Sequence, residues 1–149
     1  GALQAAELYL QIYAAVGSLR SLTASAYLAA GRLEEARAEV RRGLAASTER
    51  NARGHRAPLL RLEAEVLAGQ ESAEPAGALE CLREALALAV ELGMRPEVAH
   101  CHLGLGKFYR RSGRRRQAQE HVKTATTLFH EMEMRFWLQK AEAEMRAIV

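Results

Sequence analysis

The sequence predicts an all-α fold, and three observations carry this prediction. Alanine and leucine, both strong helix formers, make up 50 of the 149 residues. Valine, isoleucine and threonine together number only 14, too few for an extensive sheet. A pattern of small and aromatic residues returns after about 40 residues, as expected for stacked pairs of helices. The length suits a single domain, residues 1–149.

The repeat is most regular near the two ends of the chain. A small residue, a tyrosine, a glycine and an alanine follow at identical spacing at Ala24, Tyr27, Gly31 and Ala36, and at Gly106, Tyr109, Gly113 and Ala118. A middle copy without the aromatic runs from Ala64 to Ala78. Small residues allow two antiparallel helices to approach closely, and the glycine ends the first of them. We therefore expect burial at Ala24, Ala36, Ala78, Gly106 and Ala118.

Helical periodicity and turn residues then predict each element in order. The first helix, 2–16, is the second half of an interrupted repeat, and a last helix, 134–148, caps the array. Three pairs lie between them, at 18–30 with 33–47, 55–68 with 75–92, and 95–112 with 114–132. The linkers are 48–54 and 69–74. The predicted segments are a partial repeat (1–17), three repeats (18–48, 55–93 and 95–132) and a capping segment (133–149).

This pattern resembles the tetratricopeptide repeat (TPR). The long period, and the segments 53–65, 102–109 and 134–138, resemble the C-terminal TPR regions of large bacterial signalling regulators that carry an ATPase or cyclase module. The resemblance implies a right-handed solenoid that is a fragment of a larger protein. It also implies a non-catalytic interaction module, acting as a regulatory or sensor arm, whose partner is a protein, a peptide or another domain of the parent chain.

In TPR arrays the first helices of the pairs line a concave groove, which the resemblance makes the candidate binding surface. The groove residues not expected to be used in packing are Ser18, Ser21, Ser25, Arg61, Glu65, His100, Leu103, Lys107 and Arg111. An alternative function is a sensor that binds a small ligand or short peptide in this groove.

Positive charge is concentrated in the last pair. Residues 95–130 contain eight Lys and Arg against two Glu, and the densest part is Arg110, Arg111, Arg114, Arg115 and Arg116. This basic cluster could bind nucleic acid, a weaker alternative function. We expect a solvated turn instead, because Gly113 separates the arginines and no aromatic platform accompanies them.

The sequence contains no motif for catalysis or for a metal or other cofactor. Aspartate is absent, which excludes a Ser-His-Asp triad and an EF-hand, and no phosphate-binding loop or zinc-ligand spacing occurs. His100, Cys101 and His102 point in different directions on a helix, so they cannot converge on a metal with Cys81. We expect the cysteines to pack as small apolar residues and His121 and His130 to be exposed.

Three further expectations concern the surface and the cellular location. Trp137 lies on the apolar stripe of the last helix and should seal the array, whereas Phe136 should be half exposed. Leu3, Leu10 and Tyr13 on the first helix suggest a homodimer through the N-terminal end. Two cysteines, no secretory signal and no long apolar run favour a cytoplasmic protein with no membrane segment.

Overall fold

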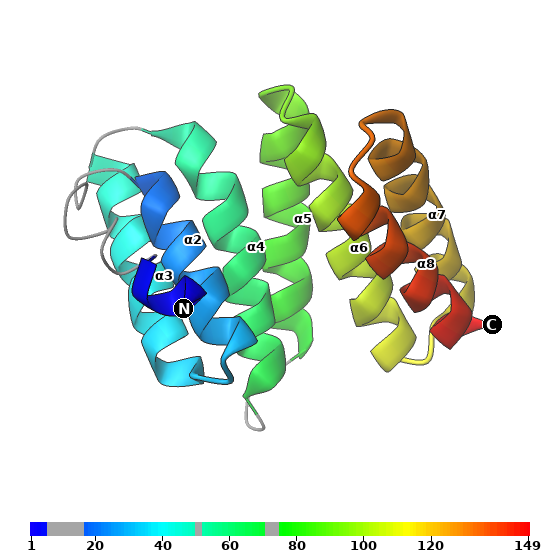
Figure 1. Ribbon diagram of the computed structural model, residues 1–149, viewed down its shortest axis with the longest axis horizontal. Coiled ribbons are helices and arrows are strands. Elements are labelled where there is room, and N and C mark those ends of the chain that lie inside the picture. Colours follow the sequence, from blue (N-terminus) through cyan, green and yellow to red (C-terminus); the bar gives the residue numbers. More distant parts are fainter. Residues whose placement is uncertain (6–16, 50–51, 71–74) are drawn as a thin grey trace. The chain divides into compact units, whose positions relative to one another are not determined.

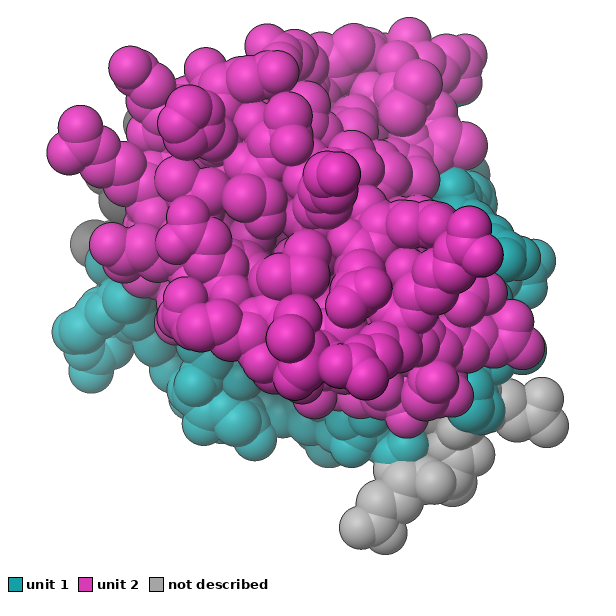
Figure 2. Space-filling view, turned by 90° about the vertical axis from the view of Figure 1, so that its right-hand side faces the viewer, with its two compact units in different colours: residues 1–85 teal, residues 86–149 magenta. Residues whose placement is uncertain are grey.

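The computed structural model describes residues 1–5, 17–49, 52–70 and 75–149, and the described residues form helices and turns with no strand. The prediction of an all-α fold is confirmed. The chain divides into two compact units, residues 1–85 and 86–149, coloured separately in Figure 2. We describe each unit by itself.

The helices match the predicted ones to within two residues at each end (Figure 1). They are α2 (Gly17–Ala29), α3 (Leu33–Glu49), α4 (Arg53–Gly69), α5 (Pro75–Glu91), α6 (Arg95–Arg111), α7 (Arg115–Glu131) and α8 (Arg135–Ile148). Residues 2–5 are helical, and the rest of the helix predicted at 2–16 lies outside the described residues. The linker predicted at 48–54 is shorter than expected, because α3 continues to Glu49 and α4 begins at Arg53. Among the described helices, none has the length and apolar character that crossing a membrane requires.

A regular module of one helix and one short turn underlies the period of about 40 residues. Each helix from α3 to α7 contains 17 residues. Their starts, with that of α8, fall at residues 33, 53, 75, 95, 115 and 135. Successive starts are therefore 20 residues apart, except between α4 and α5, where the turn is two residues longer.

Four of the turns share one backbone geometry. The second residue after each of these helices has a positive φ, at Gly31 (74°), Gly93 (68°), Gly113 (75°) and Glu133 (56°). Around Gly113, the Gly113 N–H donates to the Arg110 carbonyl and the Arg114 N–H donates to the Tyr109 carbonyl. These paired bonds satisfy the last carbonyls of the helix, as in a Schellman motif. Only at Glu133 does a residue with a side chain occupy the left-handed position.

Unit 1 contains a mostly aliphatic core between α2, α3 and α4, which lie side by side (Figure 1). Its buried members are Ala24, Ala36, Val40, Leu62 and Val66, with Tyr27, Leu28, Leu33 and Leu44 packed against them. The Arg32 guanidinium lies 4.8 Å from the centre of the Tyr27 ring, a cation–π contact at the α2–α3 turn.

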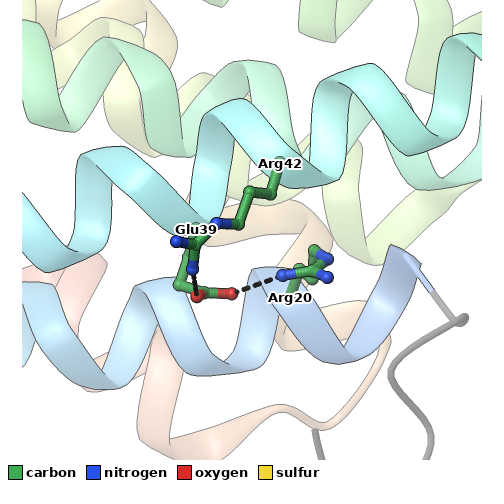
Figure 3. A network of polar contacts seen from close by, with 3 residues as sticks. All are labelled: Arg20, Glu39 and Arg42. Carbon is green, nitrogen blue, oxygen red and sulfur yellow. Dashed lines mark hydrogen bonds and ion pairs between the residues drawn. The ribbon is translucent and has the colours of Figure 1, made fainter.

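A buried carboxylate links α2 and α3 of unit 1 (Figure 3). Glu39, only 6% exposed, accepts a 3.0 Å hydrogen bond from Arg20 on α2 at one oxygen. Its other oxygen accepts a 3.0 Å hydrogen bond from Arg42, one turn further along α3. Each carboxylate oxygen thus has a charged donor, as burial of a carboxylate requires.

Unit 2 packs α6, α7 and α8 around a core that contains an aromatic ring. Phe129 is completely buried, and the other buried members of this core cluster are Ala99, Leu103, Ala125 and Ala141. Leu128, Met132, Met134 and Leu138 pack against the cluster. The prediction that α8 packs through its apolar face is therefore confirmed.

The small residues of the repeat lie at close contacts between helices, as predicted. Ala24, Ala36 and Ala118 have no exposed surface, Ala78 is 4% exposed, and Gly106 is buried. A Cβ atom placed on Gly106 would lie 2.3 Å from a Val122 methyl group, so α6 and α7 approach at a distance that only glycine permits at this point.

Candidate binding surfaces

The predicted groove residues of unit 1 are polar, and two of them pair with each other. Ser21 is half-buried, Ser25 is exposed, and the side chain of Ser18 is not described. Arg61 and Glu65 lie one turn apart on α4 and form an ion pair of 3.4 Å. Because these two charges neutralise each other, this part of unit 1 presents little net charge to a ligand.

Of the predicted groove residues of unit 2, two pack against the core and two are at least partly accessible to solvent. Leu103 was expected to be free of packing, and this is wrong: it is 3% exposed and belongs to the α6–α7–α8 core. The His100 ring, 4.4 Å from that of Trp137 and 5.2 Å from that of Phe129, packs edge-on against both. Lys107 is half-buried and Arg111 exposed. The buried face of α6 is wider than helical spacing predicted, because α6 contacts both α7 and α8.

The basic cluster at the α6–α7 turn is partly neutralised. Arg110 forms an ion pair with Glu144 of α8, and Arg116 forms one of 3.4 Å with Glu120 on its own helix. Arg111, Arg114 and Arg115 are exposed. Arg110 is therefore a contact between helices, which sequence spacing alone gives no means of recognising because Glu144 lies 34 residues away.

Two aromatic side chains are exposed at the opposite end of unit 2, where α8 begins. Phe136 is 61% exposed and Trp137 is 37% exposed, whereas the four other aromatic residues that the structure describes are buried or half-buried. Their rings meet edge to face at 5.1 Å, and the Lys140 ammonium lies 5.4 Å from the centre of the Phe136 ring. Trp137 contacts the His100 and Phe129 rings but remains exposed, so it covers the core less completely than the predicted seal would.

A pair of histidines between α6 and α7 is the feature that sequence reasoning missed. His102 Nδ1 lies 3.0 Å from His121 Nδ1, and both rings are half-buried. The expectation that His121 is exposed is therefore wrong. The Tyr109 ring stacks on His121 at 5.5 Å and an angle of 11°. The signal available in the sequence was the antiparallel pairing about Gly113, which places residues before that turn opposite residues after it.

His102 is electrically neutral at neutral pH. Burial lowers the pKa of His102 from 6.5 to about 4, and the neighbouring His121 adds to this effect by repulsion. With His102 neutral, one Nδ1 atom carries a proton and donates to the other. The pair consequently forms a hydrogen bond between α6 and α7.

The two cysteines have the packing role expected of them rather than a reactive one. Cys101 is completely buried, and its thiol lies 3.9 Å from a Glu97 carboxylate oxygen. Burial raises the pKa of the half-buried Cys81 thiol, and the negative charges of Glu63, Glu84 and Glu80 raise it further. A raised pKa keeps the thiol protonated and unreactive.

Concave sites in unit 2 are small and open to solvent. One depression of about 340 Å³ lies between Arg110, Gly113, Arg115 and residues 147–149 at the end of α8. Within the described part of the chain, no three His, Cys or Glu side chains are grouped as a metal site would require. Comparison with protein-family models and with curated proteins found no match to this chain.

Proposed function

We propose that this chain is a TPR module that binds another protein without catalysing a reaction. It would serve as a regulatory or sensor arm of a larger bacterial signalling protein. The all-α repeat of helices and the buried small residues support a preformed surface that binds with little ordering cost. The partner is a protein, a peptide or another domain of the same polypeptide.

The observation that carries this proposal is the exposed aromatic pair at the start of α8. Tryptophan, and aromatic residues generally, are enriched where proteins bind one another, because a rigid ring buries a large area at small entropic cost. Contacts of Phe136 with Lys140 and of Trp137 with His100 restrict the orientations that the two rings can adopt.

Site-specific photo-crosslinking in the native cell tests the proposal. A photoreactive phenylalanine at position 136 of the full-length protein should give one discrete adduct, identifiable by mass spectrometry. The same amino acid at Lys123, exposed on α7, is the matched control and should give none. Trp137→Ala should remove the adduct without loss of helical circular dichroism. Equal labelling from both positions, or no adduct from position 136, would contradict the proposal.

The basic cluster permits a direct test of nucleic-acid binding as the alternative function. Because Arg110 and Arg116 already pair with glutamates, we expect no measurable binding of random duplex or single-stranded nucleic acid at physiological salt. Fluorescence anisotropy is the measurement. Binding whose logarithm falls with log salt at a slope of about −0.9 per phosphate contacted, and which Arg114→Glu with Arg115→Glu abolishes, would favour the alternative instead.

A further inference from the structure

One side of α8 carries a row of exposed residues that runs most of the length of the helix. Its members are spaced by four, three and four positions, so helical geometry places them on one face. They are Phe136, Lys140, Ala143 and Ala147. At a rise of about 1.5 Å per residue the row extends about 16 Å. We call these four residues, with the adjoining Trp137, the α8 face.

Positive charge lies at both ends of the α8 face. At the aromatic end, the Lys140 ammonium lies 5.4 Å from the centre of the Phe136 ring. An ammonium group has three donors, so it can bind a carboxylate while it contacts the ring. At the other end, Ala147 and the exposed Arg115 line the same depression. Carboxylates of a ligand are therefore favoured at both ends of the face.

The two glutamates of α8 leave this positive charge in place. Glu144 forms an ion pair with Arg110 of α6, and its side chain is only 11% exposed. Glu142 follows Lys140 by two positions, which turns it about 200° around the helix axis to the opposite side of α8. Neither carboxylate thus competes with a ligand for Lys140 or Arg115.

The sequence of chemical groups along the α8 face fits one kind of ligand. The two aromatic rings offer apolar area to an aliphatic or aromatic side chain. The small side chains of Ala143 and Ala147 leave room for larger apolar groups between the two positive ends. Acidic residues on the same ligand would meet Lys140 and Arg115, and opposite charge also speeds the encounter. A basic ligand would be repelled at both ends.

We propose that the α8 face binds an acidic amphipathic segment of a partner protein. Apolar side chains of the segment would lie on the rings and alanines of the face, and its carboxylates would pair with Lys140 and Arg115. A helix of about 11 residues is long enough to span the face. This inference rests on the proposed function, because it states the chemistry of the partner.

Selection from a phage library of random peptides of about 12 residues, with the purified chain as bait, tests the proposal. We expect the enriched peptides to combine acidic residues with leucine, isoleucine or aromatic residues. Fluorescence anisotropy of a selected peptide then measures affinity. Lys140→Glu should weaken binding at least about tenfold, because it places like charges together, and Trp137→Ala should do so through lost apolar contact. The matched control Lys123→Glu, at an exposed position on α7, should bind as the parent does.

Replacement of one peptide carboxylate by lysine gives an independent readout. At the position that meets Lys140, the lysine peptide should bind Lys140→Glu more tightly than it binds the parent. Circular dichroism establishes that each variant is folded. No enriched peptide, enriched peptides without acidic residues, or an affinity unchanged in folded Lys140→Glu would overturn the proposal. Self-association of the parent that Lys140→Glu removes would also overturn it and assign the face to a second copy of the chain.

The crosslinking experiment at position 136 separates this inference from the proposed function. A discrete adduct whose crosslinked partner segment is basic or uncharged would overturn the acidic segment and leave the proposed function standing. Absence of an adduct would contradict the proposed function itself.

Discussion

The two units use the same close packing of helices but place different polar pairs between them. Unit 1 buries a carboxylate, Glu39, between the guanidinium groups of Arg20 and Arg42. Unit 2 places two half-buried imidazoles, His102 and His121, against each other between α6 and α7. Unit 2 also carries 11 Lys and Arg against 7 Glu, whereas unit 1 carries 10 against 11. Small residues at the helix contacts are thus the shared requirement of the repeat, and the polar groups beside them are free to differ.

Overpacking a small residue at a helix contact should produce the largest loss of stability. Ala118→Leu adds three carbon atoms at a completely buried contact of α7 and should lower the free energy of unfolding by about 3 kcal/mol. Hydrogen exchange should show the loss mainly in amides of α6 and α7 rather than of α2 and α3. Ala143→Leu, at an exposed position of α8, is the control. A variant of Ala118 that melts like the parent would remove the basis of the repeat assignment.

Each unit has a glycine at a close contact between helices, Gly43 in unit 1 and Gly106 in unit 2, and the atoms facing the two glycines differ. Gly106→Ala should lower the stability of unit 2 by about 2 kcal/mol, because the new Cβ would lie 2.3 Å from a methyl group of Val122, a β-branched side chain that cannot rotate away within a helix. At Gly43 in unit 1 the new Cβ would lie 2.8 Å from the end of the Leu59 side chain and 3.4 Å from the Arg20 Cβ. Because the end of a leucine side chain can shift more easily than a valine methyl group, Gly43→Ala should cause a smaller loss. Chemical denaturation of the two variants measures the difference, and equal losses would contradict the distinction.

Acid should affect unit 2 through its histidines. The pKa of His102 is about 4 in the folded protein and about 6.5 when unfolded, so the unfolded chain binds more protons between these values. Stability should therefore be complete above about pH 6.5 and fall as the pH drops toward 4, by about 1 kcal/mol after allowance for solvent screening of a half-buried ring. Thermal melts of the parent and of His102→Gln between pH 4 and 7 test this, and parallel curves would count against it.

The smallest expected effect concerns the turn of unit 2 that lacks glycine. Glu133→Gly should raise the free energy of unfolding by about 0.5 kcal/mol, because relief of the left-handed conformation exceeds the extra entropy of glycine in the unfolded chain. Gly113→Ala, at the equivalent turn, should lower stability by about 1 kcal/mol. Differential scanning calorimetry resolves both shifts, and a destabilised Glu133→Gly would show that the Glu133 side chain compensates for its backbone.

The sequence predicts the helices much better than the surfaces. Helix ends and buried small residues follow from local signals, such as Gly31, Gly113 and the alanines that face them, and the structure confirms them. The exposure of individual groove residues depends on which neighbouring helix covers them. Leu103 is buried because α6 contacts α8 as well as α7, and Arg110 is paired because Glu144 reaches it from α8. Such contacts between distant segments carry no local signal.

The structure bears on the membrane prediction but does not test the predictions of a dimer, a cellular location and a single domain. No described helix has the length and apolar character to cross a membrane. The dimer predicted through the N-terminal end rests on Leu3, Leu10 and Tyr13, and the last two lie outside the described residues. The dimer, the cytoplasmic location and the single domain of residues 1–149 stay predictions.

The 20-residue spacing of helix starts has a consequence for how such a chain can change in length during evolution. Helices joined by three-residue turns run in alternating directions. Loss or duplication of one module would reverse every helix after it and bring unmatched faces together. Loss or duplication of two modules restores the original direction and matches each apolar face with its usual neighbour. Viable length variants of this chain should therefore differ by steps of about 40 residues, an even number of modules.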